Sequence, residues 1–341
     1  MSFRPVLVAA CLTAALAFAP QAAADKRGKP RAFIESSAIV APQRVGEFML
    51  EGSQQWPDQK FAGVQFRYLL PGHEALRIDV FVYPHGDMPQ ARAIETGLRD
   101  FLDTLDAQVR AGNFSDFQVL NDAPMTLPRF ASSVAEKALP AAASEAPAGT
   151  AEGTPKDTAA TTAPAQAAAA SEAQTGDATD PADADPITAL LAEAAQSKGR
   201  RLALSYRIAD PDIPSQRIEM RSMGYLFYKQ LYLFKGRISA AASQIDEAEF
   251  QTLTDRAMRE LIPAIQVFNT GSCAQVAINV DPDKLDGDSA DSIALDLIAA
   301  MNAKIERNCG ERLDTPEFKA ASRDAEVRRV DYDPEDWGGG P

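Results

Sequence analysis

Histidine, the side chain best suited to acid–base chemistry near neutral pH, is scarce in this 341-residue chain. The chain contains only two histidines, His73 and His85. They flank an expected strand at residues 76–83, which places them too far apart to share a metal ion or a catalytic dyad. Each is typical of a solvated turn, and His85 with Asp87 is the better pair for a site. The histidines therefore do not indicate catalysis.

A run of aspartates supplies the ligand type that calcium prefers. The candidate ligands are Asp281, Asp283, Asp286 and Asp288. An EF-hand loop starting at the first of them needs a ligand at position 285, glycine at 286 and glutamate at 292. The chain has Leu285, Asp286 and Ser292 instead, so only a calcium site of another kind fits. The alternative is a solvated acidic loop that charges the start of the next helix.

Cysteine usage indicates a disulfide rather than a redox or metal site. Cys273 and Cys309 have neither a C-x-x-C spacing nor a histidine near them in sequence, and in an oxidising compartment such a pair is expected to be joined. In the chain-entropy model, a disulfide that closes this loop stabilises the folded state by roughly 3–4 kcal/mol. Ser272 lacks a nucleophile elbow, and no phosphate-binding, dinucleotide or zinc motif occurs. We expect no cofactor, and a non-catalytic protein is favoured.

The first 24 residues read as a cleavable secretory signal peptide. Arg4 supplies a positive charge, residues 5–19 an apolar stretch, and residues 22–24 a small-x-small cleavage site. A loose lipobox ending at Cys11 is the alternative, in which that cysteine becomes the lipidated N-terminus. The stretch is too short for a permanent span. We therefore expect a bacterial periplasmic or secreted protein with no stable membrane span after cleavage.

The most distinctive later segment is an aromatic hairpin at residues 223–234. With Lys229 and Gln230 as the turn, Phe227 faces Tyr232 and Tyr225 faces Phe234, which predicts one aromatic face packed as core beneath a helix. The other face has an apolar tip that grades into basic residues. It is a candidate surface for a ligand or partner, or for a second helix, and consists of Leu226, Tyr228, Leu231, Leu233, Lys235 and Arg237.

The remaining pattern predicts an α+β fold, in which an antiparallel β-sheet packs against two or three helices. Strands are expected at residues 61–70, 76–83, 114–120, 129–137, 201–208, 216–228, 231–239 and 274–280. Helices are expected after a cap at Asp87, with Pro89 in the first turn, as far as Gly112, at 186–195, behind a capping box formed by Asp246 and Glu249, and along Ile293, Leu297, Met301 and Ile305.

A long, disordered insertion rich in Ala, Pro and Thr interrupts this fold at residues 138–186. Its only large aliphatic residue is Leu139, and it holds eight acidic residues against Lys156, so it cannot bury enough apolar surface to become ordered. The expected organisation is a signal peptide at 1–24, a flexible N-terminus at 25–44, the first part of the domain at 45–137, the insertion at 138–186, the second part (or a second small domain) at 187–310, and a flexible tail at 311–341.

Charge limits the classes of partner. The chain has a formal net charge of −14, which disfavours binding to nucleic acid and to anionic membranes. About half of that charge lies in the insertion. We expect a non-catalytic protein that binds an envelope protein or a small ligand; an envelope assembly or structural factor is the alternative, and a hydrolase is a third possibility.

Overall fold

The computed structural model describes residues 31–129, 195–210, 212–213, 215–275 and 290–337. Its strands are β1 (Ser36–Pro42), β2 (Arg44–Val45), β3 (Phe48–Gln55), β4 (Val64–Leu69), β5 (Arg77–Pro84), β6 (Ser115–Pro128), β7 (Gln196–Ala209), β8 (Arg217–Lys229), β9 (Tyr232–Ala241), β10 (Gln266–Thr270), β11 (Cys309–Gly310) and β12 (Ala325–Asp331). Its α-helices are α1 (Gln90–Arg110), α4 (Glu247–Ala264), α5 (Ala290–Arg307) and α6 (Pro316–Ala321).

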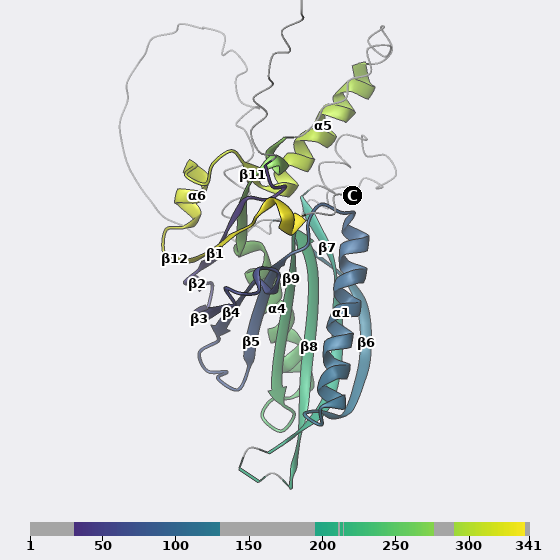
Figure 1. Ribbon diagram of the computed structural model, residues 1–341. Helices are drawn as coiled ribbons and strands as arrows, with labels where there is room; N and C mark the ends of the chain where they lie inside the picture. Colours follow the sequence, from purple (N-terminus) through teal and green to yellow (C-terminus); the bar gives the residue numbers. More distant parts are fainter. Residues whose placement is uncertain (1–30, 130–194, 211, 214, 276–289, 338–341) are drawn as a thin grey trace, which may run out of the picture.

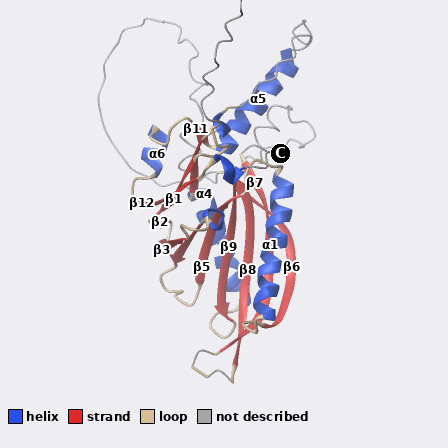
Figure 2. Ribbon diagram, viewed as in Figure 1, coloured by secondary structure: helices blue, strands red, loops and turns tan. Residues whose placement is uncertain are grey.

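The described residues are mostly β-sheet and form two sheets rather than the single sheet expected (Figure 2). The larger is antiparallel throughout, in the order β2-β3-β4-β5-β9-β8-β7-β6. It joins strands from both sides of the expected insertion, because β5 pairs with β9. The smaller sheet has the order β11-β10-β1-β12 and is mixed, since β10 and β11 run parallel.

The predicted insertion falls between two strands that pair with each other. Pro128 at the end of β6 lies opposite Gln196 at the start of β7. The Ala/Pro/Thr-rich residues, the expected strand at 129–137 and the expected helix at 186–195 lie outside the described residues, apart from one residue at either end. The chain thus leaves the large sheet and returns to it at the same point.

One long helix covers each face of the large sheet (Figure 1). Helix α1 buries Ala93, Ile94, Gly97, Phe101 and Leu105, a spacing that forms one side of a helix. Helix α4 begins at the predicted cap, where Asp246 accepts a hydrogen bond from the backbone N–H of Glu249 at 2.9 Å. It ends at Ala264, just after Pro263.

Both helices approach the sheet over a glycine. A Cβ added to Gly224 of β8 would come within 2.5 Å of the ring of Phe101 on α1. A Cβ added to Gly236 of β9 would come within 2.2 Å of the sulfur of Met258 on α4. Because adjacent strands present these glycines to opposite helices, α1 and α4 pack closely on the two faces at the middle of the sheet.

The aromatic hairpin differs in register from the prediction by two residues. Gln230 and Leu231 form the turn, with φ values of 55° and 67°, and Phe227 lies opposite Phe234. An even loop preserves the faces, so the aromatic face joins the main core beneath α4. The turn places two non-glycine residues in the left-handed region, which a local turn preference does not predict.

Both chain ends are structured where we expected flexible segments. In the N-terminal segment, predicted flexible over residues 25–44, the run Ser36–Pro42 forms β1, whose five central residues are buried. In the C-terminal tail, predicted flexible over residues 311–341, α6 and β12 form, and Val330 and Tyr332 are buried. Each apparent tail supplies the pairing partner of the other, because β12 pairs with β1 along seven residues.

The predicted disulfide is present between Cys273 and Cys309. Both residues are buried, and their Cα atoms are 5.9 Å apart. The bond links the turn after β10 to β11, so it fixes the edge of the small sheet to the end of α5.

Candidate functional site

Part of the predicted partner face is covered by α1. Leu226 and Leu233 are fully buried in a cluster with Ile94, Phe101 and Leu105 of that helix. Leu231 belongs to the turn and is buried in the main core. Leu226 and Leu233 therefore meet a helix, which was the alternative that the sequence left open, whereas Tyr228 and Leu231 line a separate small pocket.

The basic end of the predicted face borders an open groove of about 490 Å³ on the large sheet. Its walls combine partly buried apolar side chains with a few polar ones, as small-molecule sites do. The residues that line it are Ala75, Arg77, Asp79, Phe81, Phe114, Tyr206, Ile208, Ile218, Met220, Arg237, Ser239, Ala240, Ala241 and Gln244.

Arg237 of β9 is fixed in this groove by aromatic side chains. Its guanidinium carbon lies 5.6 Å from the ring centre of Phe114 and 5.8 Å from that of Tyr206, and those two rings stack on each other with centres 4.4 Å apart. It donates a hydrogen bond to the Tyr206 hydroxyl at 3.1 Å. Among the described residues, no carboxylate pairs with Arg237, so its positive charge faces the groove uncompensated.

The carboxylate nearest in register is already occupied. Asp79 of β5 lies directly opposite Arg237 in the ladder, but its oxygens accept hydrogen bonds from Gln65 at 2.7 Å, Arg67 at 2.9 Å and Arg77 at 2.7 Å. Burial raises the pKa of Asp79, and these three donors outweigh it, so the net pKa lies below the usual value. The groove is thus lined by two arginines, Arg77 and Arg237, against the single carboxylate of Asp79, and its net charge is positive.

Lys235 is the second basic residue of the predicted face, and it is held by aromatic rings near the same region. Its ammonium nitrogen lies 4.7 Å from the ring centre of Phe81, 5.7 Å from that of Tyr83 and 5.6 Å from that of Phe101. Burial lowers its pKa to about 8, with a smaller lowering from Arg237. This lysine therefore links the groove to the side chains beneath α1.

The other residues singled out by sequence do not join the groove. His73 lies 3.9 Å from a carboxylate oxygen of Glu249. His85 packs edge-on against Tyr228, with ring centres 6.4 Å apart, and burial lowers its pKa. Asp281, Asp283, Asp286 and Asp288 of the calcium candidate lie outside the described residues. Within the described residues, no group of three or more His, Cys, Asp or Glu side chains is arranged to hold a metal ion.

Sequence reasoning found Arg237 but missed the side chains gathered around it. Two of them had a readable signal: once residues 61–70 and 76–83 pair as a hairpin, Arg67 and Asp79 are opposite each other. Tyr206 and Phe114 carry no such signal, because β7 and the end of α1 reach the groove only through the sheet order. Pairing between distant strands, rather than any local motif, assembles this site.

Comparison of the chain with protein family models, with curated proteins and with solved structures gives no match. In the described part of the chain, no helix is long and apolar enough to cross a membrane. The functional argument therefore depends on the geometry of the groove.

Proposed function

We propose that this protein is a non-catalytic binding protein that takes an amphipathic anion in the groove beside Arg237. The acidic head group of the ligand pairs with the guanidinium. Its apolar part lies across Phe81, Ile218 and Met220, which are only partly buried in the free protein. The observation that carries this proposal is the uncompensated charge of Arg237, held between aromatic rings inside a groove of about 490 Å³.

The hydrogen bonds in the groove support binding without conversion of the ligand. Ser239 Oγ lies 2.9 Å from Ser222 Oγ and 3.3 Å from the Tyr206 hydroxyl. Among the described residues, no histidine lines the groove, and its one carboxylate, Asp79, is held by two arginines. A serine needs a base to act as a nucleophile, so this arrangement favours a recognition site over a hydrolase.

We further propose that the protein acts outside the cytoplasm, in the periplasm or after secretion. The disulfide between Cys273 and Cys309 supports this, because such bonds persist in oxidising compartments. The signal-like pattern of residues 1–24 supports it independently. The mass of the protein purified from its own cells tests the location: it should begin near Asp25 and contain no free thiol.

Calorimetric titration with three probes tests the binding proposal. Laurate has an acidic head and an apolar chain, lauryl alcohol has the chain alone, and acetate has the head alone. We expect laurate to bind best. Replacing the guanidinium in R237M should weaken laurate binding by about 10–100-fold, the cost of one charge-assisted hydrogen bond. R217Q, which changes an exposed arginine of β8, is the matched control and should bind like the wild type.

Two results would overturn the proposal. One is equal affinity of the wild type for laurate and lauryl alcohol, since the arginine would then contribute nothing. The other is unchanged laurate binding in R237M. Recovery of chemically altered ligand after incubation would instead show that the protein is an enzyme.

A further inference from the structure

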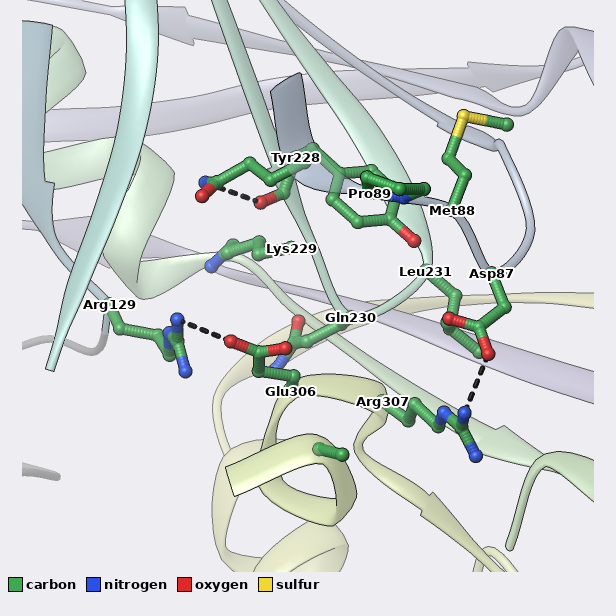
Figure 3. A pocket seen from close by; sticks show the side chains of 12 residues that line it. Asp87, Met88, Pro89, Arg129, Tyr228, Lys229, Gln230, Leu231, Glu306 and Arg307 are labelled. Atoms are coloured by element: carbon green, nitrogen blue, oxygen red, sulfur yellow. Dashed lines mark hydrogen bonds and ion pairs between the residues drawn. The ribbon is translucent and has the colours of Figure 1, made fainter. Parts of the chain in front are cut away.

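A second, smaller pocket lies at the other end of the large sheet (Figure 3). It has a volume of about 170 Å³ and is enclosed by the β8–β9 turn, α5 and the loop before α1. Two ion pairs brace its rim: Arg129 to Glu306 at 2.9 Å and Arg307 to Asp87 at 2.6 Å. No residue lines both this pocket and the groove, and along the chain Leu231 of the pocket and Arg237 of the groove are six residues, or about 20 Å, apart.

The wall of this pocket contains a lysine that has no acidic partner. Lys229 is only 5% exposed, and within the described residues no carboxylate pairs with it. Its amine donates a hydrogen bond to the Ile265 carbonyl at 2.7 Å and lies 4.7 Å from the ring centre of Phe234. Burial lowers the pKa of Lys229 to about 7, with a smaller lowering from Arg129. A large share of the amine is therefore uncharged at neutral pH, the form that acts as a nucleophile.

The turn that holds this lysine is kept in an unfavourable conformation by tertiary contacts. Gln230 and Leu231 both have positive φ, which costs energy for residues with a side chain. Two hydrogen bonds from β10 hold the turn. The side-chain oxygen of Gln230 accepts from the Val267 N–H at 2.8 Å, and its backbone carbonyl accepts from the Asn269 side-chain amide at 3.0 Å. Strained backbone held in this way is concentrated at binding and catalytic sites.

Gln230 also provides a donor that the protein itself does not use. It lines the pocket and is 2% exposed, and its amide nitrogen has no acceptor among the described residues. A buried donor without an acceptor is costly. A ligand oxygen in the pocket would supply that acceptor.

We propose that the pocket binds a small aldehyde or ketone through a reversible covalent bond to Lys229. The amine nitrogen attacks the carbonyl carbon. A C=N bond forms, the C=O bond breaks, and the oxygen leaves as water with the two amine protons, so no further reactant is needed. A remaining hydroxyl or carboxylate oxygen of the ligand accepts from Gln230. This site is independent of the groove and of the anion proposed there.

Reductive trapping tests this proposal on the full-length protein. Glycolaldehyde and sodium cyanoborohydride are added at neutral pH, and peptide mass spectrometry identifies each lysine that becomes a secondary amine. We expect Lys229 to be labelled about tenfold or more faster than Lys319, which is exposed on α6. K229R should lose the label at this position, with an unchanged circular dichroism spectrum.

A second variant tests the pocket without changing the lysine. Ala303 of α5 lines the pocket, so A303F should fill the space and prevent labelling of Lys229, while Lys319 is labelled as before. A320F, a substitution on the exposed side of α6, is the matched control. Labelling of Lys229 no faster than of Lys319, or full labelling of Lys229 in A303F, would overturn the proposal.

Discussion

The buried amine of Lys229 should make the free energy of unfolding rise with pH, and the substitution K229M should remove that rise. Replacing it in K229M keeps an unbranched side chain of similar length but removes the titrating group. Because Lys229 is 5% exposed and has no acidic partner among the described residues, its charged form is destabilised in the folded state. The unfolded chain solvates that charge freely.

The direction of this pH dependence follows from the pKa of Lys229 in the folded and in the unfolded state. The folded protein releases the Lys229 proton at a pKa of about 7, and the unfolded chain releases it at an ordinary lysine value of 10.5. Between these values the unfolded state binds more protons, so the free energy of unfolding rises with pH. Each pH unit in this window is worth about 1.4 kcal/mol. Raising the pH from about 7 to about 9.5 should therefore stabilise the wild type by about 3 kcal/mol through this residue.

Urea unfolding followed by circular dichroism across this pH range measures the effect. K229M should lack about 3 kcal/mol of the pH-dependent gain that the wild type shows. Lys235, whose pKa is lowered to about 8 by burial, is present in both proteins and cancels in the comparison. K319M, which removes an exposed lysine, should keep the full gain.

Parallel stability curves for the wild type and K229M would refute this reasoning. That result would mean that Lys229 is solvated in the folded protein. A constant offset between the curves is expected and does not bear on the outcome, because the Ile265 carbonyl loses its donor in the variant.

Three further perturbations test the fold. G224A should lower the free energy of unfolding by about 1–3 kcal/mol, because the added Cβ would overlap the ring of Phe101 on α1. In G52A the added Cβ meets open space, so the free energy of unfolding should change by no more than about 1 kcal/mol. Equal losses in the two variants would contradict the close packing of α1 on Gly224. D246A should cost about 1 kcal/mol by removing the cap of α4, which D246S should largely retain. Replacing Cys273 and Cys309 with serine should cost about 3–4 kcal/mol in urea unfolding, and an unchanged midpoint would contradict a stabilising disulfide.

Elements set by local patterns could be predicted from the sequence. Helix α4 begins at its cap and ends beside its proline, and the bounds of β4 and β5 lie within three residues of those of the expected strands. In each case the side chains that determine the element are close together in the chain. Periodicity and capping therefore identified the pieces of the large sheet.

Elements that depend on distant partners could not be predicted in this way. The run Ser36–Pro42 is short and apolar, and only pairing with β10 and β12 makes it a core strand. The β8–β9 turn lies one residue later than predicted, which shifts the pairing by two residues, because Gln230 is anchored to β10, which is remote in sequence. The same limit applies to the groove, where Arg237 meets Tyr206 and Phe114 through the strand order.

Apolar spacing also identified α5 without revealing its surroundings. Leu297, Met301 and Ile305 repeat every four residues, as the prediction required, yet each is about half exposed (45%, 56% and 48%). The spacing shows that a helix forms but does not show which of its faces the fold covers.

The position of β1 has a consequence for the order in which the protein is completed. A chain that is synthesised or exported from its N-terminus presents β1 first, but both neighbours of this strand, β10 and β12, come from the last quarter of the sequence. Until they emerge, β1 is an unpaired apolar segment of the kind that chaperones bind and that aggregates when it is left uncovered. The final contacts to form include that between the hydroxyls of Tyr332 and Tyr232. Loss of β12 should therefore uncover one edge of β1.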